Sequence, residues 1–141
     1  MNSVSLDKNI LTANEYLILL ESVGWDAPPY EQAGTAIENS LYTVLIKTDG
    51  VPIGMGRVCG DGAIVFYFKD IVVMPEFQRK GIGKMIVNNL IEYVKSCVKE
   101  DWCVYAELMT GEPNFDFYSR FGFQKRLDDS EGKGMILWMN K

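Results

Sequence analysis

The sequence predicts an α+β fold, in which helices flank a central, mostly antiparallel sheet. Two aspartate-glycine pairs, Asp49-Gly50 and Asp61-Gly62, lie between β-branched apolar runs and indicate tight turns in a meander. Apolar residues at helical spacing occur both before and after this meander. The chain has 141 residues and 48% hydrophobic content, enough for one sizeable core. We therefore expect a single domain over residues 1–141.

The N-terminal third is expected to form two helices. Thr12 and Glu15 have the spacing of a capping box, and the apolar pattern that follows them ends near Gly24. Pro28 and Pro29 then start a second, weakly amphipathic helix that extends to about residue 40. Strands are expected over residues 41–48, 51–58 and 63–73.

The C-terminal half alternates between helical and extended patterns. We expect a long helix over 83–98, a strand over 102–108, a shorter helix over 113–121 and a final strand over 134–140. About four helices would therefore surround the sheet.

Composition excludes several classes of protein. A formal net charge of −5 argues against nucleic acid as the main partner, since the basic residues near position 80 form only a local patch. Three cysteines and no histidine favour neither a disulfide framework nor a metal site. The apolar runs are too short for a membrane span and the first residues lack the order of a signal peptide, so we expect a cytoplasmic protein.

The most informative segment joins the strand ending at Val73 to the long helix through a basic turn, residues 78–84. A helix N-terminus presents unpaired N–H groups and the positive end of the helix dipole. Gly81 and Gly83 remove side chains that would keep a bulky anion away, and Arg79, Lys80 and Lys84 add positive charge. The segment therefore predicts a pyrophosphate-binding turn.

The spacing of the glycines alone is weak, because Gly-x-Gly occurs four times. A dinucleotide fingerprint requires a third glycine, but Ile86 occupies that place after Gly81 and Cys59 occupies it after Gly54. The sequence also lacks a Gly-x-x-x-x-Gly-Lys-[Ser/Thr] phosphate loop. An unrelated module for phosphate ligands remains a third interpretation.

Two motifs resemble those of the GNAT family of N-acetyltransferases. The first is Gln78-Arg79-Lys80-Gly81-Ile82-Gly83, which is similar to the family's Gln/Arg-x-x-Gly-x-Gly/Ala signature and follows a strand ending in Val73-Met74-Pro75. The second is Phe117-Tyr118-Ser119-Arg120-Phe121-Gly122-Phe123, which resembles the family's Phe-Tyr-x-x-x-Gly-Phe segment. Both occur in the expected order within residues 68–123.

The resemblance implies a twisted sheet split by a V-shaped gap, where a bulged central strand diverges from the next. It also implies acetyl-CoA as co-substrate, with the Val73 N–H polarising the thioester oxygen. The residues expected to bind the cofactor are Ile71, Val72, Val73, Gln78, Arg79, Lys80, Gly81, Ile82, Gly83, Lys84, Asn114, Phe117 and Tyr118. One departure is Gly111, at a position where relatives often have an asparagine that binds the pantetheine arm.

The family's chemistry assigns Tyr118 as the general acid that protonates the departing thiolate in a direct transfer. The general base remains open between Asp70, Glu107, Glu112 and ordered water. Glu107 is expected to end a strand facing the gap, where burial would raise its pKa. Asp70 is an unusual charge in an apolar strand, so it could equally be a structural group fixed by hydrogen bonds.

The acceptor is expected to be a small primary amine. Trp25 and Tyr30 flank two prolines and could line an aromatic acceptor site together with Arg57, although a loop packing role is the simpler interpretation. The acidic composition favours a cationic acceptor over a basic protein tail. The alternative function is a non-catalytic acyl-CoA sensor, and a homodimer is possible because such pairing is common among the proteins it resembles.

Overall fold

The computed structural model describes residues 3–126, 135 and 137. Its contacts divide the chain into two units, Met1–Met109 and Thr110–Lys141, which are described separately below. The α+β class is confirmed, with a five-stranded sheet and four α-helices among the described residues. The strand expected over 134–140 lies almost wholly outside the described residues, and the prediction of a single domain stays a prediction.

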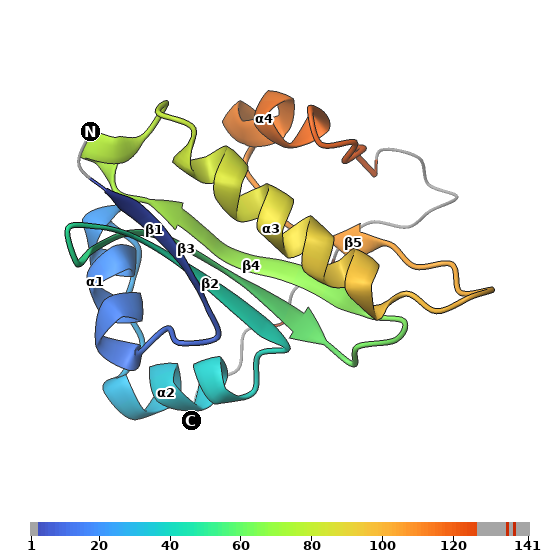
Figure 1. The fold of residues 1–141 in the computed structure, drawn as a ribbon, viewed down its shortest axis with the longest axis horizontal. Coiled ribbons are helices and arrows are strands. Elements are labelled where there is room, and N and C mark those ends of the chain that lie inside the picture. Colours follow the sequence, from blue (N-terminus) through green and yellow to red (C-terminus); the bar gives the residue numbers. More distant parts are fainter. Residues whose placement is uncertain (1–2, 127–134, 136, 138–141) are drawn as a thin grey trace. The chain divides into compact units, whose positions relative to one another are not determined.

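The sheet belongs to the first unit and has the order β1-β2-β3-β4-β5 (Figure 1). The first four strands are antiparallel, whereas β5 pairs with β4 in parallel. Their bounds are β1 Val4–Lys8, β2 Tyr42–Thr48, β3 Val51–Gly60, β4 Phe66–Val73 and β5 Ala106–Glu107.

Two strands differ from the sequence-based expectation. Strand β1 was not predicted, because Val4 and Leu6 alternate with polar residues over only five positions. The strand expected over 102–108 has only two paired residues, because β5 keeps its ladder with β4 only at Ala106 and Glu107.

The helices in the first unit are α1 Ala13–Ser22, α2 Tyr30–Glu38 and α3 Ile82–Cys97, close to the predicted ranges. The second unit contains α4 Phe115–Ser119, which is shorter than the predicted 113–121. Short 3-10 turns, Pro75–Phe77 and Glu112–Asn114, precede α3 and α4 respectively. None of the helices in the described part of the chain has the length and apolar character that crossing a bilayer requires.

The sheet lies between α3 on one face and α1 with α2 on the other (Figure 1). Successive residues of β3 show this alternation, since side chains along a strand point to opposite faces. Met55 is fully buried in a cluster with Leu19 and Leu20 of α1. Gly54 and Gly56 face α3 instead, where a Cβ on Gly56 would lie 2.7 Å from Ile86 Cγ2.

The close approach of α3 explains the first Gly-x-Gly pair. A contact of 2.7 Å between carbons is far inside van der Waals distance, so a side chain at Gly56 would force Ile86 or the helix to shift. These glycines therefore serve packing, which agrees with the absence of a dinucleotide fingerprint there.

The two predicted turns form by different means. Asp49 and Gly50 both have positive φ, 49° and 79°, as a two-residue hairpin with the twist of type I′ requires. Asp61 instead accepts hydrogen bonds with its carboxylate from the backbone N–H groups of residues 63–65. These bonds lower the pKa of Asp61 and keep residues 63–65 in the turn, so β4 begins at Phe66 rather than at residue 63.

Candidate functional site

The N-terminus of α3 has unbonded backbone donors. Gly81 is its cap residue, in the left-handed region with φ of 87°, and it supplies no side-chain cap. The first bond that closes the helix runs from the Met85 N–H to the Gly81 carbonyl, at 3.1 Å. The N–H groups of Ile82, Gly83 and Lys84 thus lack helical acceptors, and no other described residue accepts from them.

Positive charge surrounds these donors. Arg79, Lys80 and Lys84 are exposed, and the first turn of α3 has no acidic residue. Arg79 also has a positive φ, 59°, so the turn contains two left-handed residues within three positions, and left-handed residues occur in the backbone concavities that bind anions. A Cβ on Gly81 would meet no atom within 4 Å, so the space in front of the turn is open. The geometry fits a diphosphate.

The strand before this turn is bulged. Lys69 of β4 lies opposite Arg57 of β3, yet Val72 lies opposite Met55, so one extra residue is inserted in β4. Within this insertion Asp70 has φ of 54°, a conformation that costs a residue other than glycine about 1 kcal/mol or more. The bulge that the family resemblance implies is therefore present.

The bulge changes which main-chain groups of β4 face β3. Every second residue of an antiparallel strand directs its N–H and C=O groups to its partner. Before the bulge the odd-numbered residues face β3. This follows from the 3.1 Å bond between the Asp61 N–H and the Val65 carbonyl, because the same register continues to the pair of Arg57 and Lys69. After the bulge the even-numbered residues face β3, since Met74 N–H bonds to the Ile53 carbonyl at 2.9 Å. Val73 therefore directs its N–H away from β3.

The opposite side of β4 separates from β5. The two strands pair only at Phe66 with Ala106 and at Tyr67 with Glu107. Among the described residues, none of those in β5 pairs with β4 beyond Tyr67. The Val73 carbonyl on that side accepts a 3.0 Å hydrogen bond from Gln78 Nε2, which ties the basic turn to the end of β4. The Val73 N–H is thus aimed at the side where the sheet splits.

Asp70 is held by two donors on one oxygen atom. Its Oδ2 accepts from Arg57 Nε and from the Tyr16 hydroxyl, both at 2.8 Å. The side chains of Arg57 and Asp70 are only 9% and 8% exposed. Protonating Asp70 would break a buried ion pair, so the structure favours the structural alternative over a role as general base.

Arg57 also differs from its expected role in an acceptor site. Besides Asp70, its guanidinium donates to the Ala36 carbonyl at 3.0 Å and to Ser40 Oγ at 2.9 Å. The side chain is buried, and its Nε and Nη1 atoms donate within the protein, so Arg57 connects the end of α2 to β4.

Tyr16 is a residue that the sequence analysis missed as part of the site. Burial, together with the nearby charge of Asp70, raises the pKa of Tyr16 well above its usual range. Tyr16 occupies a position in the apolar stripe of α1, and this position is the one signal in the sequence that the residue is buried. Nothing in the sequence indicates that its hydroxyl bonds to Asp70, 54 residues away.

Tyr67 is a second residue that the sequence analysis missed, at the point where β4 and β5 separate. Burial raises the pKa of Tyr67, and the charges of Glu107 and Asp70 raise it further, while a hydrogen bond from the Met109 N–H opposes them. Tyr67 and Glu107 are direct partners across the strands, so their side chains lie on the same face. Glu107 is exposed, so the expectation that it is buried at the gap is wrong, but it remains the carboxylate beside the split.

The two aromatic candidates of the acceptor site are both exposed. Trp25 follows α1 and is 50% exposed, and Tyr30 is the first residue of α2 and is 61% exposed. Each residue therefore has surface available for contact with a ligand and surface covered by the protein, and the acceptor site stays a prediction.

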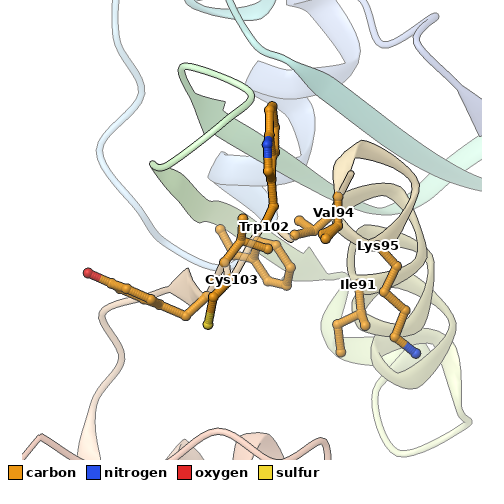
Figure 2. Close-up of a pocket in the computed structure, with 10 residues that line it drawn as sticks. Ile91, Val94, Lys95, Trp102 and Cys103 are labelled. Atoms are coloured by element: carbon orange, nitrogen blue, oxygen red, sulfur yellow. The ribbon is translucent and has the colours of Figure 1, made fainter. Parts of the chain in front are cut away.

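A pocket of about 370 Å³ lies elsewhere in the first unit (Figure 2). It is lined by Ile91, Val94 and Lys95 from the C-terminal half of α3, and by Trp102 and Cys103 from the segment before β5. The pocket begins about 10 Å along the helix from Lys84, given the 1.5 Å rise per residue. It is therefore separate from the basic turn.

The second unit contains the remaining cofactor and catalytic candidates. Tyr118 lies on α4, packed edge-to-face against Phe117 at 4.9 Å and Phe123 at 6.0 Å between ring centroids. Burial among these rings raises the pKa of Tyr118. Asn114 is the residue before α4, but its side chain makes no capping hydrogen bond. Glu112 lies in the preceding turn and is exposed.

Comparison with known proteins agrees with this geometry. The model of the acetyltransferase (GNAT) family matches residues 11–123, most of the chain. The chain therefore belongs to the GNAT family, which places it among the N-acetyltransferases.

Individual relatives support the same conclusion. The uncharacterized N-acetyltransferase ycf52 of Pyropia yezoensis is 29% identical over 134 residues, which are 92% of this chain and 74% of that protein. A crystal structure from meticillin-resistant Staphylococcus aureus, described as a probable acetyltransferase, is 31% identical with a TM-score of 0.85, and 97% of this chain matches all of that one. An aminoglycoside N-acetyltransferase in complex with CoA shares the fold at 14% identity and a TM-score of 0.67, covering 100% and 96% of the two chains.

Proposed function

We propose that this protein transfers the acetyl group of acetyl-CoA directly to a primary amine of a small molecule. The observation that carries the proposal is the N-terminus of α3, where three unbonded N–H groups follow a glycine cap among basic residues. In a chain of the GNAT family, these donors suit the diphosphate of coenzyme A.

The end of β4 suits the reacting thioester. The Val73 N–H points to the side where β4 and β5 separate, and a donor in that position can stabilise the negative charge that develops on the thioester oxygen. The amine forms a bond to the carbonyl carbon, the carbon–sulfur bond then breaks, and the thiolate takes up a proton.

Tyr118 is the proposed donor of that proton. Its raised pKa keeps the phenol protonated throughout the neutral range, so the donor form is fully populated. An ammonium acceptor loses one proton to Glu107 or to water before it attacks, because the carboxylate of Asp70 is held in its ion pair. The second proton, which leaves the nitrogen as the amide forms, restores the phenol of Tyr118.

The proposed acceptor is small and cationic. Glu107 lies beside Tyr67 where the strands separate, and a carboxylate there would attract an ammonium group. Trp25 and Tyr30 are exposed and could contact the body of such an acceptor.

The test measures coenzyme A binding by calorimetry and thiol release from acetyl-CoA with a panel of amines. We expect binding, release with at least one amine, and a loss of about 100-fold in kcat in Tyr118→Phe. Tyr105→Phe is the matched control, since Tyr105 is 56% exposed and lies on the segment that lines the separate pocket. Tight binding without release for any amine would instead indicate a sensor, and equal competition by ATP would indicate a general phosphate module.

A further inference from the structure

Three side chains from different elements converge on the bulge of β4. Tyr16 comes from α1, Arg57 from β3 and Asp70 from the bulge itself. The two donors share one carboxylate oxygen of Asp70, each at 2.8 Å, and the arginine Cζ lies 5.8 Å from the centre of the tyrosine ring. We call these three residues the bulge clamp.

We propose that the bulge clamp is a positioning device for acyl transfer, which holds β4 in the register that directs the Val73 N–H towards the split in the sheet. This inference rests on the proposed function of Val73 as the donor to the thioester oxygen. None of the three side chains needs to touch the substrate for the proposal to hold.

The first argument is the conformation of Asp70. A residue other than glycine with φ of 54° within a strand is strained, and such strain persists only where surrounding contacts enforce it. The buried ion pair with Arg57 and the bond from Tyr16 supply that enforcement. An aspartate here, rather than a glycine, indicates that the side chain is needed as an anchor.

The second argument is the register. Before the bulge, β4 pairs Lys69 with Arg57, and extending this register without the extra residue would place Val73 opposite Ile53. The Val73 N–H would then bond to β3, as the Met74 N–H does in the native register. Loss of the bulge would therefore remove the proposed oxyanion donor, and it would also turn the Val73 carbonyl away from Gln78 Nε2.

The third argument is the reach of the clamp. Through Arg57, it also holds the Ala36 carbonyl and Ser40 Oγ at the end of α2. The clamp thus fixes β4 to both helices that cover this face of the sheet, and movement of either helix would be transmitted to the bulge.

A matched pair of tyrosine variants tests the proposal. Tyr16→Phe removes the hydroxyl that donates to Asp70, and Tyr42→Phe removes a hydroxyl that donates to Asn89 on α3. We expect Tyr16→Phe to lower kcat about ten-fold with the coenzyme A affinity within two-fold of wild type. Tyr42→Phe should change stability alone. Equal kcat values in the two variants, corrected for the folded fraction, would overturn the proposal.

Substitutions at Asp70 separate the effect of its side-chain hydrogen bonds from the effect of its positive φ. Asp70→Gly accepts the positive φ without strain but removes the anchor, whereas Asp70→Asn tolerates this φ and keeps an oxygen acceptor. We expect kcat to fall in the order wild type, Asn, Gly. Wild-type kcat in Asp70→Gly would show that the bulge needs no clamp.

Amide hydrogen exchange gives a readout that does not depend on catalysis. In the native register the Met74 N–H is bonded to β3 and the Val73 N–H is not. Asp70→Gly should therefore raise protection at Val73 and lower it at Met74, and an unchanged pattern would overturn the proposal. If the wild-type protein fails to transfer acetyl groups, the proposed function fails, but the exchange pattern still tests the clamp.

Discussion

The N-termini of α1 and α3 meet the same physical requirement in opposite ways. At α1, Thr12 Oγ1 accepts from the Glu15 N–H at 3.2 Å, and the Glu15 carboxylate accepts from the Thr12 N–H at 3.0 Å. At α3, the cap is Gly81 and the residue at the place of Glu15 is Lys84, so neither bond can form.

The difference between the two N-termini indicates which sequence features distinguish a capped helix end from one that suits a ligand. Every helix begins with N–H groups that lack helical acceptors, and an acidic side chain near them is favourable. The first turn of α1 supplies its own oxygen acceptors, whereas α3 supplies basic residues and an open approach. The N-terminus of α3 therefore suits an external anion, as proposed for coenzyme A.

The largest expected effect comes from making α3 resemble α1. Lys84→Glu places an acid at the third helical position, where it suits the helix dipole and repels a diphosphate. We expect coenzyme A affinity to fall by about 2 kcal/mol, roughly 30-fold, at low salt. Stability should stay the same or rise by about 0.5 kcal/mol. Calorimetry and urea denaturation measure the two quantities.

Lys95→Glu is the control for this change. Lys95 lies in the last turn of α3, about 16 Å from Lys84 along the helix, and pairs with Glu92 at 3.2 Å. The same reversal of charge there should leave the affinity unchanged. An equal loss of affinity in both variants would mean that net charge, rather than the helix end, attracts the ligand.

The second effect concerns the cap of α1. Thr12→Ala removes the acceptor of the Glu15 N–H and should lower the free energy of unfolding by about 1 kcal/mol. Coenzyme A affinity of the folded protein should not change, because α1 provides no donors for the cofactor. A fall in affinity that matches Lys84→Glu would contradict the division of roles between the two helices.

Local patterns made both helix ends predictable. The capping box at Thr12 and the glycines of the basic turn are short-range signals, because the residues that cooperate are within a few positions of one another. The motif around Tyr118 and the bulge of β4 came from the resemblance to the family, since no spacing in the chain indicates an extra residue in a strand.

The bulge clamp was not predictable in the same way. Periodicity assigns Tyr16 to the buried face of α1, but it gives no information on which residue of the sheet will lie opposite. Arg57 was expected at an acceptor site because it lies in the hairpin region to which substrate recognition was assigned. Its burial against Asp70 shows a different role. Such long-range pairs depend on the packing of α1 and α2 over the sheet.

The third effect tests the glycine cap itself. Gly81→Ala and Gly50→Ala are a matched pair, since both glycines have positive φ, 87° and 79°, and neither Cβ would meet an atom within 4 Å. Both variants should lose about 1 kcal/mol of stability through backbone strain. Only Gly81→Ala should also weaken coenzyme A binding, by about five-fold, because its methyl group enters the space in front of the donors. Equal affinities would place the cofactor away from this turn.

The smallest effect is a pH dependence at α1. Burial acts to raise the pKa of Glu15, but hydrogen bonds from Lys47 and Thr12 outweigh it and the pKa is lowered. A carboxyl group with a lowered pKa contributes stability that is complete above its unfolded pKa and is lost as the pH falls through its folded pKa.

The difference in the free energy of unfolding between wild type and Glu15→Gln should therefore be constant near neutral pH and shrink in acid. The decrease should be less than about 1 kcal/mol, because the pair is partly solvated. Urea denaturation of both proteins from neutral pH to about pH 3 measures the difference, around the ordinary glutamate pKa. A difference that persists at the lowest pH would mean that the negative charge of Glu15 does not stabilise the N-terminus of α1. In that respect α1 would then resemble α3, which has no acidic residue in its first turn.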